Sequence, residues 1–112
     1  MKTNDYEVIF AIVDSGFAED VMEVAREQGA RGGTILTARG VARENAAAFF
    51  GITLPAEKEV LMMVVEKTVR DAVMNAIYQR MGMAKKAHGI AFSLPVSDVA
   101  GLAPLPEQNT QA

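Results

Sequence analysis

Residues 29–40 read GARGGTILTARG, in which four glycines surround the strand-like run TILT. The residues before Gly29 show the apolar spacing of a helix, and glycine is the usual residue just beyond a helix C-terminus. Thr34–Ala38 is therefore expected to form a short and rather polar strand. From Arg39 to Glu57 no clear hydrophobic period follows, which predicts a long loop after this strand.

The rest of the chain extends this pattern in both directions. Two segments are apolar almost throughout, as is typical of strands buried on both faces. A loosened capping box, Thr68–Asp71, is expected to open the second helix. The predicted elements are strands over 6–13, 34–38, 59–65 and 90–94, with helices over 17–28 and 68–82.

The order β-α-β-β-α-β predicts an α+β fold, the ferredoxin-like sandwich with an antiparallel sheet. The first and third strands are the apolar ones and should be central, whereas Thr34, Thr37, Ser93 and Pro95 suit edge strands. With both helices on one face, the other apolar face stays open, which favours self-association. We expect one domain over 1–102 and a flexible tail over 103–112.

Composition excludes several classes of protein. A net charge of −3 and a pI near 5.1 argue against binding to nucleic acid. The chain has no cysteine and a single histidine, His88, so a transition-metal site is not expected, and His88 is best read as a surface residue. No apolar stretch has the length of a membrane span and no signal peptide is evident, so a cytoplasmic protein without membrane insertion is predicted.

The glycine-rich stretch resembles the PII signal-transduction family. Gly29, Gly32, Thr34 and Gly40 have the spacing of that family, Arg43 stands where it usually has an arginine, and GIAF at 89–92 resembles its Gly-x-Ile-Phe stretch. The resemblance implies a homotrimer of ferredoxin-like subunits with an adenine nucleotide in each cleft between neighbours. It also implies that the loop over 40–57 is the T-loop, which changes shape to control a protein target.

On this resemblance the nucleotide site should combine small residues at the cleft wall with cations for phosphate. Gly32 is expected to allow a positive φ or close packing, and Gly40 to let adenine lie against the backbone. The residues assigned to the site are Gly32, Thr34, Gly40, Arg43, Val65, Lys85, Lys86 and Gly89. The alternatives are that the glycines only shape turns and that the lysines only favour a helix C-terminus.

The chain departs from the family at the phosphate side of this site. The segment before the last strand, MAKKAH over 83–88, has fewer glycines than the family's, and no arginine follows the last strand. ADP, AMP or another ligand is therefore as compatible as ATP, and Mg²⁺ carried by the nucleotide is compatible with the sequence. The predicted loop has no tyrosine, which argues against control by uridylylation.

The loop instead carries the run Glu44–Phe50, with adjacent Phe49 and Phe50. Exposed aromatic residues are common anchors of protein interfaces, so Glu44, Phe49 and Phe50 are assigned to partner binding. The alternative is that a phenylalanine packs on the trimer and fixes the loop.

The resemblance implies a regulatory protein with a transporter or an enzyme as its target, and the chain itself is not expected to be an enzyme. A cleft enzyme on the same scaffold is the less favoured alternative, since no cluster of titratable groups suggests catalysis. A small-molecule or metal-responsive ferredoxin-like trimer is the other alternative, and the missing cysteine argues against copper.

Overall fold

The computed structural model describes residues 5–41, 57–81 and 89–102. Several sequence predictions fall outside these ranges. They concern Arg43, Glu44, Phe49 and Phe50 in the loop, Lys85, Lys86 and His88 before the last strand, and the tail over 103–112.

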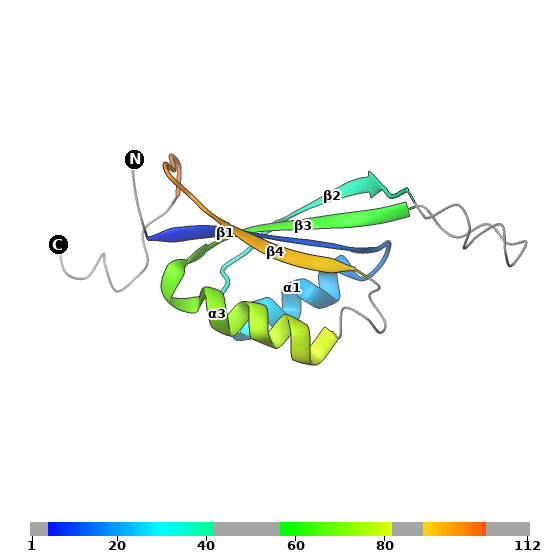
Figure 1. The fold of residues 1–112 in the computed structure, drawn as a ribbon, viewed down its shortest axis with the longest axis horizontal. Helices are drawn as coiled ribbons and strands as arrows, with labels where there is room; N and C mark the ends of the chain where they lie inside the picture. Colours follow the sequence, from blue (N-terminus) through cyan, green and yellow to red (C-terminus); the bar gives the residue numbers. More distant parts are fainter. Residues whose placement is uncertain (1–4, 42–56, 82–88, 103–112) are drawn as a thin grey trace, which may run out of the picture.

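The described elements follow the predicted order. They are β1 (Tyr6–Asp14), α1 (Ala18–Glu27), β2 (Thr34–Arg39), β3 (Glu57–Glu66), α3 (Lys67–Ala76) and β4 (Ile90–Pro95). A π-helical segment, Ile77–Met81, continues α3. The strands form one antiparallel sheet in the order β2-β3-β1-β4, and Figure 1 shows both helices beneath a single face of it. The α+β ferredoxin-like prediction is confirmed, with β1 and β3 central and β2 and β4 at the edges.

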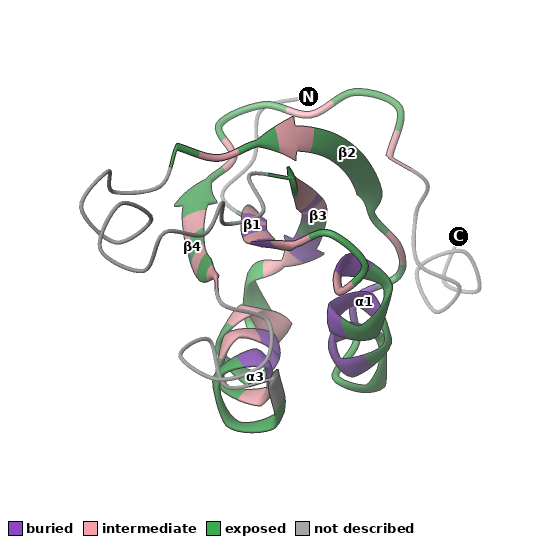
Figure 2. Cartoon of the chain, turned by 90° about the vertical axis from the view of Figure 1, so that its right-hand side faces the viewer, coloured by how far each residue is buried: buried purple, intermediate pink, exposed green. Residues whose placement is uncertain are grey.

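The core lies between the sheet and the helices. Along β1, burial alternates strictly, and Ile9, Ala11 and Val13 are fully buried toward the helices. The helices contribute apolar residues at helical spacing, as Figure 2 shows by their buried inner sides. The main core side chains are Ile9, Val13, Val21, Met22, Leu61, Met63, Val73 and Ile77.

The C-terminus of α1 has the predicted glycine cap. Gly29 adopts φ of +114°, and its N–H donates to the Arg26 carbonyl at 3.1 Å. The Ala30 N–H donates to the Ala25 carbonyl at 3.1 Å, which completes a Schellman motif. The chain therefore turns sharply out of the helix toward β2.

The capping box predicted at the start of the second helix is wrong. Thr68 lies inside α3, whose N-cap residue is Glu66, and no side chain caps that end. The physical reason is the length of β3, which runs on to Glu66 in register with Tyr6 and leaves no separate turn before the helix.

The N-terminus of α1 is capped from a distant strand. Its N-cap residue, Phe17, offers no polar side chain. Glu59 of β3 lies on the helical face of the sheet, next to the N-terminus of α1. Oε1 of Glu59 accepts hydrogen bonds from the N–H groups of Gly16 and Ala18, each at 3.0 Å. A carboxylate at a helix N-terminus satisfies free donors and complements the helix dipole. β3 is thereby fixed to the turn between β1 and α1.

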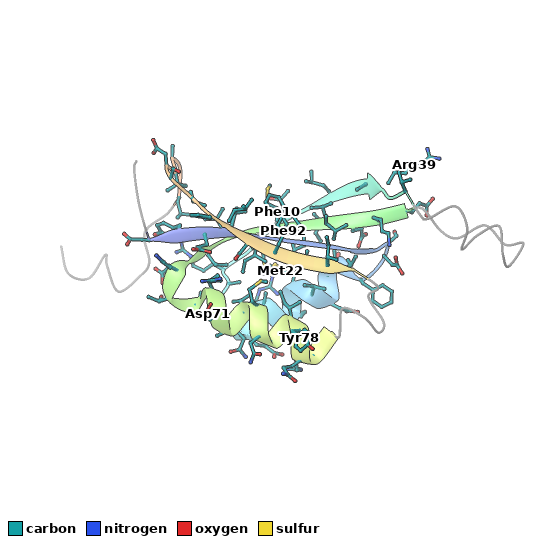
Figure 3. All side chains as sticks on the ribbon, viewed as in Figure 1. Phe10, Met22, Arg39, Asp71, Tyr78 and Phe92 are labelled. Carbon is teal, nitrogen blue, oxygen red and sulfur yellow. The ribbon has the colours of Figure 1, made fainter. Side chains whose placement is uncertain are left out.

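The face of the sheet away from the helices is apolar and open. Val8, Phe10 and Ile12 of β1 are only partly buried, and their register partners on β3 and β4 are also apolar. The rings of Phe10 and Phe92, both labelled in Figure 3, stack with centroids 5.3 Å apart. We define the open face as Val8, Phe10, Ile12, Leu36, Val60, Met62, Val64, Ile90, Phe92 and Leu94. Within residues 5–41, 57–81 and 89–102, the burial on both faces predicted for β1 and β3 is therefore reached on the helical face only.

The capping role of Glu59 gives a first prediction. Glu59→Ala removes the acceptor of the Gly16 N–H in the turn and of the Ala18 N–H at the start of α1, and should lower the free energy of unfolding by about 1 to 2 kcal/mol. Glu59→Gln retains an amide oxygen and should lose less. Glu57→Ala is the matched control, because Glu57 holds the same turn through its backbone carbonyl, at 3.2 Å from the Ser15 N–H. Urea unfolding midpoints would measure all three, and equal losses for Glu57→Ala and Glu59→Ala would contradict the assignment.

Candidate functional site

Five of the residues assigned to the nucleotide site are described: Gly32, Thr34, Gly40, Val65 and Gly89. Four of them belong to two edges of the sheet. Gly32, Thr34 and Gly40 flank or begin edge strand β2, whereas Gly89 precedes the opposite edge strand, β4. Val65 lies on the central strand β3.

Gly40 directly follows β2, at the end of the sheet where the predicted loop begins. Arg39 pairs with Glu57, so β2 and β3 stay paired up to this point. A Cβ atom placed on Gly40 would lie 3.1 Å from Cε and 3.2 Å from Cγ of Lys58. The methylene stem of Lys58 therefore lies directly beside the Gly40 backbone. Any residue with a side chain at position 40 would displace that stem.

Gly89 lies at the same end of the sheet but at the β4 edge. A Cβ atom on Gly89 would fall on the Ile12 carbonyl oxygen, well inside van der Waals contact. The backbone of residue 89 thus crosses directly against β1, and any side chain here would displace one of the two strands. This contact fixes the point from which β4 begins.

The conformational reason expected for Gly32 is wrong. Gly32 does not have a positive φ, and a Cβ atom there would meet nothing within 4 Å. The glycine that needs close packing is its neighbour, Gly33, where a Cβ atom would lie 2.9 Å from both Leu61 Cδ1 and Met63 Cγ. Gly33 lets the chain come close to β3 just before β2 begins. Because Gly32 and Gly33 are adjacent in the sequence, the sequence alone could not show which of them makes this contact.

Thr34 and Val65 differ in what they present to solvent. Thr34 is exposed at the start of β2, so its hydroxyl is accessible in the single chain. The Val65 side chain is only 3% exposed and packs in the core under the sheet. Val65 can offer a ligand its backbone only, whereas its neighbour Val64 presents its side chain on the open face.

Sequence reasoning missed an ion pair beside Gly40. Nζ of Lys58 lies 2.6 Å from Oδ1 of Asp14, and the two side chains are 24% and 31% exposed. The residues are register partners on β3 and β1, at the polar end of the open face. The alternation of side chains between the two faces of a strand could have predicted this ion pair. It places Asp14 on the same face as Ile12, and Lys58 on the same face as Val60.

A separate cavity of about 480 Å³ lies at the other end of β1 and β3. It is lined by Asp5, Tyr6, Glu66, Lys67 and Thr68, none of which was assigned to the nucleotide site. Its mixed charges do not converge on one kind of ligand. Over residues 5–41, 57–81 and 89–102, no group of three or more potential metal ligands comes together. In the same residues, no helix combines the length and apolar character that crossing a bilayer requires.

Solved structures of other proteins share this architecture. A PII-like signalling protein of Thermus thermophilus aligns with a TM-score of 0.66 at 20% identity, covering 88% of this chain and 94% of that one. CutA of Synechococcus elongatus aligns with a TM-score of 0.65 at 12% identity, over 87% and 81% of the two chains. At these identities the likeness shows the fold, a ferredoxin-like sheet of the kind found in PII-like proteins.

The family follows from the sequence itself. Residues 6–104 match the pattern of the nitrogen regulatory protein P-II family, and the chain belongs to that family. Arabidopsis thaliana PII, solved with citrate bound, aligns with a TM-score of 0.65 at 25% identity over 89% of this chain and 82% of that one. A comparison with curated protein sequences finds no match. Proteins of the P-II family are signalling regulators and not enzymes.

The packing around the glycines gives a second prediction. Gly89→Ala places a methyl group on the Ile12 carbonyl and should lower the free energy of unfolding by about 3 kcal/mol. Gly32→Ala is the matched control, since its methyl group enters open space and should change stability by less than about 0.5 kcal/mol. Denaturant unfolding would measure both, and a Gly89→Ala variant as stable as Gly32→Ala would contradict the described contact.

Proposed function

We propose that this protein is a cytoplasmic PII-like regulator. In this proposal it forms a homotrimer, binds an adenine nucleotide in clefts between subunits, and controls a protein target, such as a transporter or an enzyme, through the loop over 40–57. Trimer formation, nucleotide binding and protein targets are general properties of the family. The sheet of this chain has features that support the same assembly.

The observation that carries the proposal is the placement of Gly40 and Gly89. Both lie at the loop end of the sheet, but on opposite edges, with β3 and β1 between them. Three strand spacings separate those edges, about 14 Å. A cyclic interface joins two different surfaces of identical subunits, and in the proposed ring these would be the β2 edge of one copy and the β4 edge of the next. Such a seam would bring the two halves of the proposed site together.

The open face supports the same assembly. Leu36 and Leu94 are 46% and 48% exposed, Ile90 is 60% exposed, and all three border the partly buried centre of this face. A contiguous apolar surface of this kind is typical of an interface between subunits. Three sheets facing a common axis would cover it and leave the helices outside.

The ligand would be held by groups of complementary kinds. Exposed Thr34 and the backbone at Gly40 would form the wall from one subunit, and the segment before Gly89 would supply Lys85 and Lys86 from the next. Arg43 would add a third cation from the loop. Phosphate favours such cations and free backbone N–H groups.

Regulation would work by a shift between loop conformations. A nucleotide that contacts Gly40 and Arg43 better in one loop conformation than in another raises the population of that conformation. Glu44, Phe49 and Phe50 would then be offered to the target or withheld from it. No catalytic step is needed, which agrees with a regulatory family.

The trimer gives a third prediction. Phe10→Asp buries a charge at the centre of the proposed interface, so the variant should sediment as a single subunit while the wild type sediments as a trimer. Tyr78→Asp is the matched control, because Tyr78 is 68% exposed on the helical side and its variant should remain trimeric. Analytical ultracentrifugation distinguishes the two. A wild type that sediments as a single subunit would remove the proposed cleft.

Nucleotide binding gives a fourth prediction. A nucleotide present at about a hundred times its Kd should stabilise the protein by about 2.7 kcal/mol. Lys85→Ala should weaken binding of the best of ATP, ADP and AMP by roughly tenfold, as expected when one charged phosphate contact is lost.

Lys67→Ala is the control for this experiment, because Lys67 lines the cavity at the far end of the sheet. Calorimetric titration measures both variants. A loss of affinity in Lys67→Ala with none in Lys85→Ala would place the nucleotide in that cavity. No binding by the wild type at all would refute the nucleotide function.

A further inference from the structure

We propose that Asp14 and Lys58 are positioning residues of the nucleotide site, because their ion pair holds Gly40 in place. This inference rests on the proposed function and identifies residues that the family resemblance did not assign. It requires three links: Gly40 must rest on Lys58, Lys58 must be held by Asp14, and Asp14 must itself be fixed.

The first link is the contact between Gly40 and the lysine stem. A Cβ atom on Gly40 would come within 3.1 to 3.2 Å of Cε and Cγ of Lys58, so the lysine stem fills the space beside the Gly40 backbone that a side chain would take. Lys58 pairs with Ala38 across the two strands, and Gly40 is two residues further along, on the same face. Where the stem lies therefore decides where Gly40 can lie.

The second link is the ion pair. A lysine side chain has four rotatable bonds and offers no defined surface unless its end is held. Here Nζ is held at 2.6 Å by Asp14, and about three quarters of the lysine side chain is shielded from water. An ion pair shielded in this way orders the stem better than one in full contact with solvent.

The third link is the anchoring of Asp14. It is the last residue of β1, and the turn that follows is held to β3 by the Ser15 N–H at 3.2 Å from the Glu57 carbonyl. The carboxylate of Glu59 holds the N–H groups of Gly16 and Ala18, each at 3.0 Å. Asp14 thus directly precedes a turn that is hydrogen-bonded to β3. Its carboxylate is held in place at this point, and through Lys58 it limits the movement of Gly40.

The pair has a second reading, in which Lys58 is a direct ligand contact. The two readings differ in the role of Asp14. If Lys58 only touched the ligand, removal of Asp14 would leave the cation available, and affinity would stay the same or rise. If the pair positions Gly40, removal of Asp14 must weaken binding although the lysine is intact.

The experiment is a calorimetric titration of the trimeric full chain with the nucleotide that binds the wild type best. Asp14→Ala should raise Kd about five- to tenfold, since a small displacement of a binding group costs that much or more. Lys58→Met keeps the stem and removes the charge, and should give a similar loss. Lys58→Arg should restore most of the affinity. Unchanged or tighter binding by Asp14→Ala would overturn the proposal.

Glu27→Ala is the matched control. It breaks the ion pair between Glu27 and Arg80, at 2.9 Å on the helical side, and changes the net charge by the same amount as Asp14→Ala. Its Kd should equal that of the wild type. An equal loss in Glu27→Ala and Asp14→Ala would show an effect of net charge alone and overturn the positioning role.

Backbone ¹⁵N order parameters measured without nucleotide separate failure of this inference from failure of the proposed function. The order parameter of Gly40 should be lower in Asp14→Ala than in the wild type, and unchanged in Glu27→Ala. If the wild type binds no nucleotide, the proposed function falls, while the order parameters still decide whether the pair holds Gly40. An unchanged order parameter of Gly40 in Asp14→Ala would overturn the inference whatever the nucleotide result.

Discussion

The structure depends on one constraint: both helices cover the same face of a sheet whose central strands are apolar on both faces. Ile9, Ala11 and Val13 on one side of β1 are fully buried, whereas Val8, Phe10 and Ile12 on the other side are only partly covered by the described residues. A soluble domain does not usually leave such a surface exposed. An open apolar surface of this kind is typical of an interface between subunits, and proteins of the family form trimers.

Polar interactions gather where the apolar pattern of the sheet ends. At the loop end, Asp14 and Lys58 continue the open face as an ion pair, and Glu59 continues the buried face as a helix cap. Each of these charged residues occupies the position at which the alternating row of apolar residues along its strand would continue. The end of the sheet nearest the predicted loop is thus held by hydrogen bonds and an ion pair as well as by packing.

The sequence predicted the fold because its signals were local and periodic. Apolar runs separated the central strands from β2 and β4, and Gly29 marked the end of α1. What it could not predict depended on contacts between distant residues. Glu59 caps a helix more than forty positions away, Gly33 rather than Gly32 meets β3, and the run of β3 to Glu66 removed the turn on which the Thr68 capping box relied. Residues of the proposed site carried by the loop stay predictions.

The pairing of Arg39 with Glu57 has an evolutionary consequence. The last residue of β2 pairs with the first residue of β3. The segment between the two strands therefore starts and finishes at neighbouring positions, whatever its length. The entropy of closing such a segment rises only slowly as residues are added. Insertions and deletions there would leave the scaffold undisturbed, so descendants of one ancestor could acquire different binding segments while keeping the same sheet.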